Sequence, residues 1–226
     1  MSTKEDLNKI NKNVSASNLI KRSAAQIVYY KSKTYFYNQN KPATKAQIKG
    51  NENAEKVSTS EYIEMRGTYV TPDQTLIHFT FDEIQKKENK TVFIEHKHID
   101  DENNLEDWYI QYSILQVALY QSLAQDINHY VTAKFLRKTH ETKQLSVDNK
   151  RVFKLVFSND DFKRVYKIKV TNPEKIIEYY LNKNTHSLLQ NPTDLAKDYS
   201  IARKYDAEFK GHDWDNLKQF IKHKRN

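Results

Sequence analysis

Phe81-Asp82-Glu83-Ile84 is the first of three stretches that decide the fold of this 226-residue chain. It is followed by Val92-Phe93-Ile94-Glu95-His96-Lys97 and by Gln116-Val117-Ala118-Leu119-Tyr120. The first two stretches predict β-strands, one ending at Asp82 and the next at the Glu-x-Lys sequence. Side chains alternate along a strand, so Glu95 and Lys97 share one side and His96 takes the other. The third stretch predicts a helix in which Gln116 and Tyr120 share a face.

Two carboxylates beside a lysine suit a hard divalent cation and a phosphate in one pocket. Glu95 follows a run apolar enough to be buried, and a buried, unpaired charge is costly, which favours a functional site. A structural ion pair between Glu95 and Lys97 is the alternative interpretation, and Asp82 alone could be a capping residue at the surface. Pro72-Asp73 also offers an acidic residue, but Thr71-Pro72-Asp73-Gln74 has the signature of a turn, which explains both.

The whole chain, residues 1–226, is expected to form one α/β domain in which helices flank a central mixed β-sheet. Residues 1–14 are polar and are expected to be a flexible tail, and a hairpin loop is expected at 86–90. The predicted strands are 61–71, 76–81, 91–99, 130–136, 151–157 and 164–170. The predicted helices are one that Ser15 or Ser17 caps, a second ending near Val57, and 107–127, 173–183, 192–206 and 213–223.

Composition excludes several classes of protein. The net charge of +8 favours a polyanionic partner, although ordinary solubility would explain it too. With 3 glycines, the chain can contain neither a P-loop nor a dinucleotide-binding fingerprint. With 0 cysteines it has no disulfide, no Cys-ligated zinc and no iron–sulfur cluster. No segment approaches 18 apolar residues, so we expect a soluble, cytoplasmic protein with no membrane partner.

The order and spacing of these motifs resemble the PD-(D/E)XK nuclease superfamily, and within it the RecB-like branch, which places a Gln-x-x-x-Tyr helix after Glu-x-Lys. A looser similarity extends upstream, to Ser15-Ala16-Ser17 and then Tyr29-Tyr30. The resemblance implies a restriction-endonuclease-like core and an Mg²⁺- or Mn²⁺-dependent nuclease that hydrolyses phosphodiester bonds, with an exonuclease favoured. Single- or double-stranded DNA would be the substrate, with RNA as a further possibility. Protein partners in a larger nucleic-acid-processing complex would also be compatible with it.

Residue by residue, the resemblance implies that Asp82, Glu95 and Lys97 are catalytic. Asp82, Glu95 and the backbone carbonyl of His96 would hold the metal. Family members often carry a Gly-x-x-x-His or Gly-x-x-x-Glu upstream, but this chain has alanine four residues after Gly50, so Glu55 becomes the first choice for a further ligand.

The resemblance also implies that Gln116 and Tyr120 contact DNA phosphate or position the metal-site carboxylate, whereas their helical position would equally suit Tyr120 as an edge of the core. His78 and His98 lack metal-ligand spacing and are expected to be structural, and 218–225 is expected to be a solvated helix end. Two rival functions stay open. One is a nucleic-acid-binding or scaffold protein that keeps this fold without cutting, and the other is an interaction protein whose charge is incidental.

Overall fold

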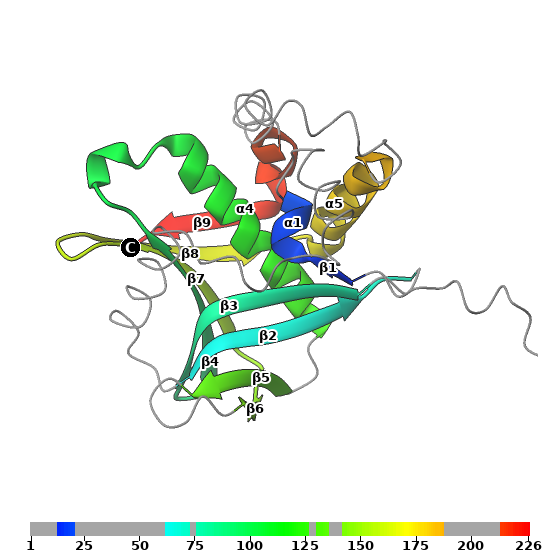
Figure 1. Cartoon of the computed structure of the whole chain (residues 1–226), viewed down its shortest axis with the longest axis horizontal. Helices are drawn as coiled ribbons and strands as arrows, with labels where there is room; N and C mark the ends of the chain where they lie inside the picture. The colour runs from blue at the N-terminus through cyan, green and yellow to red at the C-terminus, as the bar shows by residue number, and fades with distance from the viewer. Residues whose placement is uncertain (1–12, 21–61, 73–75, 127–129, 136–141, 188–212) are drawn as a thin grey trace, which may run out of the picture.

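The computed structural model describes residues 13–20, 62–72, 76–126, 130–135, 142–187 and 213–226. These residues form a mixed β-sheet against which helices pack (Figure 1). The strands are β1 (Asn13–Ser15), β2 (Tyr62–Val70), β3 (Leu76–Lys87), β4 (Lys90–His98), β5 (Tyr130–Phe135), β6 (Thr142–Ser146), β7 (Arg151–Ser158), β8 (Lys163–Val170) and β9 (Ile221–Arg225). The helices are α1 (Ala16–Ile20), α4 (Asp107–Leu123) and α5 (Pro173–Ser187), with 3₁₀ turns η3 (Glu102–Asn104), η4 (Ala124–Asp126) and η5 (Lys218–Phe220).

The sheet order is β6-β5-β2-β3-β4-β7-β8-β9, with β1 paired to β3. The β1–β3 and β4–β7 pairs are parallel, and the remaining pairs are antiparallel. Because β4 and β7 are parallel, the chain must cross the sheet between them, and α4 lies in that connection. The predicted α/β architecture is therefore confirmed, and it is compatible with a restriction-endonuclease-like core.

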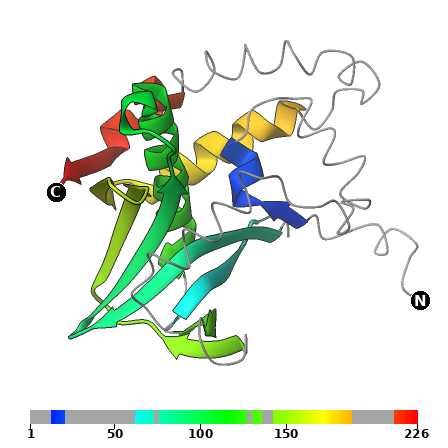
Figure 2. The same cartoon turned by 60° about the vertical axis from the view of Figure 1, so that its left-hand side comes forward.

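Helix α4 lies between the sheet and the other helices. It contacts β3, β7 and β8 on one side and α1 and α5 on the other, and Figure 2 shows the helices gathered on one side of these strands. Every residue from Ser113 to Leu123 is buried. A helix enclosed on all sides needs no single apolar stripe, which is why polar residues such as Gln116 occur within it.

Aromatic rings fill the space between α4 and the strands. The rings of Phe93 and Phe153 stack with their centroids 4.9 Å apart, and Phe81 lies 5.4 Å from Phe93. Tyr120 of α4 meets Phe81 edge-on at 5.4 Å. These contacts fix how α4 is rotated relative to β3 and β4, because offset and edge-to-face pairs are directional.

The β3–β4 hairpin differs from the prediction. Its turn consists of Glu88 and Asn89 alone, and Asn89 adopts a positive φ of 54°, which asparagine tolerates in tight hairpin turns. Lys86 and Lys87 therefore belong to β3 rather than to a loop. As a result Asp82 lies within β3, not at its end as predicted.

Two other predictions were wrong. Asn13 and Val14, expected in a flexible tail, form β1 with Ser15. The predicted helix 213–223 is α-helical over 213–217 and ends with the 3₁₀ turn η5, after which Ile221–Arg225 forms the edge strand β9. The cause is its pairing with β8, a contact between distant segments that local sequence does not encode. The predicted helices at 192–206 and upstream of Val57 lie outside the described residues.

None of the described helices is long and apolar enough to cross a membrane.

Gly67 provides a test of the packing between β2 and β3. Gly67 lies opposite Phe79, and a Cβ at position 67 would overlap the buried Phe79 ring. Gly67→Ala should lower the free energy of unfolding by about 1–3 kcal/mol, because the ring has to move within a filled core. Urea unfolding would measure this. In a Phe79→Leu background the same substitution should cost less, and an equal cost in both backgrounds would show that the ring is not the obstacle.

Candidate functional site

The two strands of the β3–β4 hairpin part near its middle. They pair from the turn only as far as Glu83 and Ile94, after which β3 continues beside β1 and β4 continues beside β7 (Figure 2). Asp82 is the first residue of β3 beyond the paired part. Its Oδ2 accepts a hydrogen bond of 2.7 Å from the backbone N–H of His96. The Asp82 side chain therefore bridges the two strands where the backbone ladder stops, and this holds its carboxylate beside Glu95.

Glu95 points from β4 toward α4 and is buried. Its Oε1 accepts hydrogen bonds from Lys97 Nζ at 2.7 Å and from Gln116 Nε2 at 2.8 Å. Its Oε2 is also buried but has no hydrogen-bond partner among the described residues. One oxygen of this carboxylate is therefore satisfied by protein, and the other remains available to a ligand.

Gln116 and Tyr120 extend this network into the helix. Gln116 Nε2 also lies 2.9 Å from the hydroxyl oxygen of Tyr120, which accepts its hydrogen bond. The Tyr120 ring packs against Phe81 and against Phe79, at 5.4 and 6.1 Å between centroids. The Tyr120 ring therefore belongs to the core, and its hydroxyl belongs to the network around Glu95, while contact with DNA stays a prediction.

Burial dominates the electrostatics of this network. Burial and then the charge of Asp82 raise the pKa of Glu95 to about 7, although Lys97 and Gln116 act in the opposite direction. Burial alone would lower the pKa of Lys97, but the charges of Glu95 and Asp82 outweigh it and raise that pKa. Burial, followed by the charge of Glu95, raises the pKa of Tyr120. Lys97 therefore remains a cation at neutral pH, whereas Glu95 can exchange a proton there.

Two residues of α4 were missed by the sequence analysis. Tyr109 and Ser113 precede Gln116 and Tyr120 at helical spacings, so the four residues form one stripe along the helix. Tyr109 contributes to the electrostatic environment of Lys97, and Ser113 Oγ is buried without a hydrogen-bond partner in the described part of the chain. Extending the Gln-x-x-x-Tyr pattern backward by one and two turns would have identified both.

A second polar network lies on the opposite side of β4. His96 Nε2 is 2.8 Å from Glu83 Oε2, and Gln85 Nε2 donates to Glu83 Oε1 at 2.7 Å. Glu83 is 1% exposed, so hydrogen bonds such as these offset the cost of burying its carboxylate. His96 also donates its backbone N–H to Asp82. The second network therefore helps to hold β4 in place from the side opposite the site. Glu83 was not identified from sequence as a partner of His96.

Three further residues were singled out in the sequence: Glu55, His78 and His98. Glu55 lies outside the described residues. His78 Nδ1 is 3.0 Å from Thr68 Oγ1, and His98 Nε2 is 3.4 Å from Asp100 Oδ1, which suits the structural roles expected for both histidines. No group of three or more His, Cys, Asp or Glu side chains that could hold a metal occurs within the described ranges. There, the acidic part of the site consists of Asp82 and Glu95.

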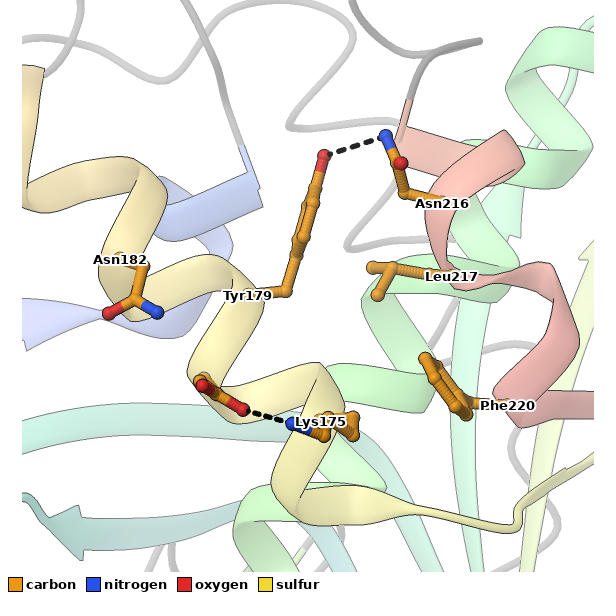
Figure 3. Close-up of a pocket in the computed structure, with 7 residues that line it drawn as sticks. Lys175, Tyr179, Asn182, Asn216, Leu217 and Phe220 are labelled. Atoms are coloured by element: carbon orange, nitrogen blue, oxygen red, sulfur yellow. Dashed lines mark hydrogen bonds and ion pairs between the residues drawn. The ribbon is translucent and has the colours of Figure 1, made fainter.

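A cavity of about 520 Å³ lies elsewhere, between α5 and the C-terminal segment (Figure 3). The Tyr179 hydroxyl stands at its wall and donates to Asp213 Oδ1 at 2.5 Å. Its lining residues are Lys175, Glu178, Tyr179, Asn182, Asn216, Leu217 and Phe220. None belongs to the cluster around Glu95, so this cavity is separate from the candidate site.

No family model and no curated protein matches the chain. Among solved structures, the chain is similar to the crystal structure of SSO0001, with 18% sequence identity and a TM-score of 0.46. The alignment covers 83% of this chain and 82% of that chain. This structural similarity is too low to indicate a function, so the function is inferred from the geometry of the site.

The raised pKa of Glu95 predicts a dependence of stability on pH. The folded carboxyl keeps its proton up to about pH 7, whereas the unfolded one loses it near 4.5. The unfolded state therefore binds fewer protons in this window, and stability falls as pH rises through it. Glu95→Gln has no carboxyl group at position 95, so it should not lose this stability as pH rises. The free energy of unfolding of the variant minus that of the native protein should therefore increase by up to about 3 kcal/mol between pH 5 and pH 8. Urea unfolding at several pH values would measure the difference.

Glu178→Gln is the matched control, because Glu178 is exposed and paired with Lys175 on the surface. Its stability should follow that of the native protein at every pH. A constant difference between Glu95→Gln and the native protein across the range would contradict the raised pKa.

The two roles of Tyr120 can be separated by substitution. Tyr120→Phe removes the acceptor of the Gln116 hydrogen bond but keeps the ring, so it should cost about 0.5–1.5 kcal/mol. Tyr120→Ala also empties the space between Phe79 and Phe81, so it should cost about 3–5 kcal/mol. Thermal and urea unfolding would measure both. Equal costs for the two variants would mean that the ring contributes little to the core.

Proposed function

We propose that this protein is a metal-dependent nuclease that hydrolyses phosphodiester bonds in DNA. One observation carries the proposal: Asp82 and Glu95 converge where β3 and β4 part, with Lys97 held against Glu95 at 2.7 Å. A buried carboxylate and a half-buried one with a single lysine between them are an unfavourable arrangement for stability alone. The same arrangement suits a site for a cation and a phosphate.

The residues present fit a hard divalent cation such as Mg²⁺ or Mn²⁺. Both carboxylates offer oxygen, the donor type that these ions prefer. Glu95 Oε2 is buried and has no hydrogen-bond partner in the described part of the chain, as expected of an oxygen reserved for a ligand. The backbone carbonyl of His96 and the carboxylate of Glu55 are proposed as further ligands.

When bound, a divalent cation would neutralise charge on the attacked phosphate and lower the pKa of a coordinated water. The protein supplies the remaining functions. Lys97 donates one hydrogen bond to Glu95 and keeps two N–H groups with which it can stabilise negative charge on the phosphate. Gln116 fixes the orientation of the Glu95 carboxylate, and Tyr120 in turn fixes Gln116. Such positioning matters because an error of about 1 Å can reduce a rate about 10²-fold.

The resemblance to RecB-like PD-(D/E)XK nucleases adds support, because the five motif residues Asp82, Glu95, Lys97, Gln116 and Tyr120 come from separate stretches and form one network. It favours an exonuclease. The net charge of +8 is in keeping with a polyanionic substrate.

A second function is favoured by one observation. The described residues provide two carboxylates at the site and no third acidic or histidine ligand. A protein that binds nucleic acid on this fold without cutting it would need no complete metal site. Such a protein would bind DNA in a salt-sensitive way and show no metal-dependent cleavage.

A cleavage assay separates the two functions. Linear, circular and single-stranded DNA would be incubated with the purified protein in Mg²⁺, Mn²⁺ or EDTA. Cleavage should require the metal, and Asp82→Asn, Glu95→Gln and Lys97→Ala should each reduce its rate by about 10²-fold or more, through loss of transition-state stabilisation. Tyr120→Phe should reduce cleavage without unfolding the protein.

Lys175→Ala is the matched control for Lys97→Ala, because Lys175 is exposed and its ion pair with Glu178 is far along the chain from the site. It should cleave at the native rate. Circular dichroism would confirm that all variants are folded. Full activity in folded Lys97→Ala would exclude the proposed catalytic role, and DNA binding without cleavage by the native protein would favour the second function.

A further inference from the structure

The strands β7, β8 and β9 have two chemically different faces. One face carries Phe153, Leu155, Phe157 and Tyr166, which are buried in the main core. The other face bears lysines in register across the three strands. Lys154 of β7 pairs with Lys167 of β8, which pairs in turn with Lys224 of β9. We call this surface the lysine face and define it as Lys154, Lys163, Lys167, Lys169, Lys222 and Lys224.

The lysine face lacks compensating charge within its own strands. The sequences of β7, β8 and β9 contain no aspartate or glutamate. Burial lowers the pKa of Lys154, and the charges of Lys87, Lys167, Lys90 and Lys163 lower it further. Like charges on directly opposite residues of a sheet are destabilising. The arrangement therefore adds nothing to the stability of the fold, and a bound polyanion would relieve the repulsion.

Protection of a sheet edge explains only part of this pattern. Lysines on an edge strand prevent pairing with other chains, and β9 lies at the end of the strand order. Lys222 and Lys224 could serve that purpose. Lys154 and Lys167 lie on β7 and β8, which are paired on both sides and have no free edge to protect.

We propose that the lysine face binds the phosphate backbone of duplex DNA, at a surface distinct from the site around Glu95. Neighbouring strands lie about 4.8 Å apart, so the row Lys154, Lys167 and Lys224 spans about 10 Å. A strand of duplex DNA presents a phosphate about every 3.4 Å along its axis, so this row faces about three phosphates.

The chemistry of the lysine face favours a duplex over a single strand. Proteins that bind single strands stack bases on aromatic rings. The aromatic residues of β7 and β8, which are Phe153, Phe157 and Tyr166, lie in the core on the other face. The residues between the lysines are instead Val152, Val156 and Val165, which pack in a small aliphatic cluster with Val92 and Ile94. Contacts would therefore be made to the backbone and would be insensitive to base sequence.

This inference goes beyond the proposed nuclease and does not require hydrolysis. Glu95 and Lys97 face α4, whereas the lysine face is on the opposite side of the same sheet. DNA held there would increase affinity for long molecules without taking part in the chemical step.

The test is binding of a fluorescent 30-base-pair duplex in EDTA, which prevents metal-dependent cleavage, over a series of salt concentrations. The triple variant Lys154→Gln, Lys167→Gln, Lys224→Gln should reduce the slope of log affinity against log salt by about 3, since each phosphate contact contributes about 0.9. Its melting temperature should not fall, because the substitutions remove repulsion between neighbours.

The control is Lys86→Gln, Lys175→Gln, Lys218→Gln, which removes the same charge from lysines already paired with Asp148, Glu178 and Asp215. It should leave the slope within about 1 of the native value. Equal losses in both variants would show that net charge alone governs binding and would overturn the proposal. The proposal would also be overturned if the native protein did not bind the duplex but bound phosphatidylserine vesicles. Cleavage in Mg²⁺ is scored separately, so failure here is distinguishable from failure of the proposed function.

Discussion

The hydrogen bonds to Glu95 are the interaction on which the centre of this structure depends. They join β4 to α4, because Lys97 comes from the strand and Gln116 from the helix. A carboxylate buried this deeply would cost several kcal/mol without such partners. The partners must therefore be in place whenever Glu95 is ionised, and this couples the register of the strand to the rotation of the helix.

The separation of β3 from β4 beyond Glu83 and Ile94 makes room for this network. In a continuous ladder, the N–H of His96 would be bonded to a neighbouring strand and no side chain could approach it. Instead β3 turns toward β1, and Asp82 accepts the bond that the ladder leaves unmade. The second carboxylate is thereby placed next to Glu95 by a backbone feature. Both acids are then close enough to influence each other's charge, as the raised pKa of Glu95 records.

Local periodicity predicted the site better than it predicted the sheet. The alternation of β4 correctly placed Glu95 and Lys97 on one side and His96 on the other, and helical spacing correctly paired Gln116 with Tyr120. The position of Asp82 within β3 was missed, because a two-residue turn at Asn89 can extend both strands beyond their apolar segments. Strands β6 and β9 were missed because their extended conformation depends on pairing with β5 and β8 and is not indicated by their own sequences. Glu83 was missed as a partner of His96 because that contact requires the register between two strands.

The same sheet also shows how charge can be distributed without disturbing a core. On the face toward α4, the charges of Glu95 and Lys97 are paired with each other within hydrogen-bonding distance. The lysine face carries cations opposite one another with no acid in their strands, an arrangement that solvent can screen but that folding gains nothing from. Edge protection accounts for β9 but not for β7 and β8, so the inner lysines point to a partner that supplies negative charge. The phosphate backbone supplies it over the whole length of about 10 Å that the row of lysines spans.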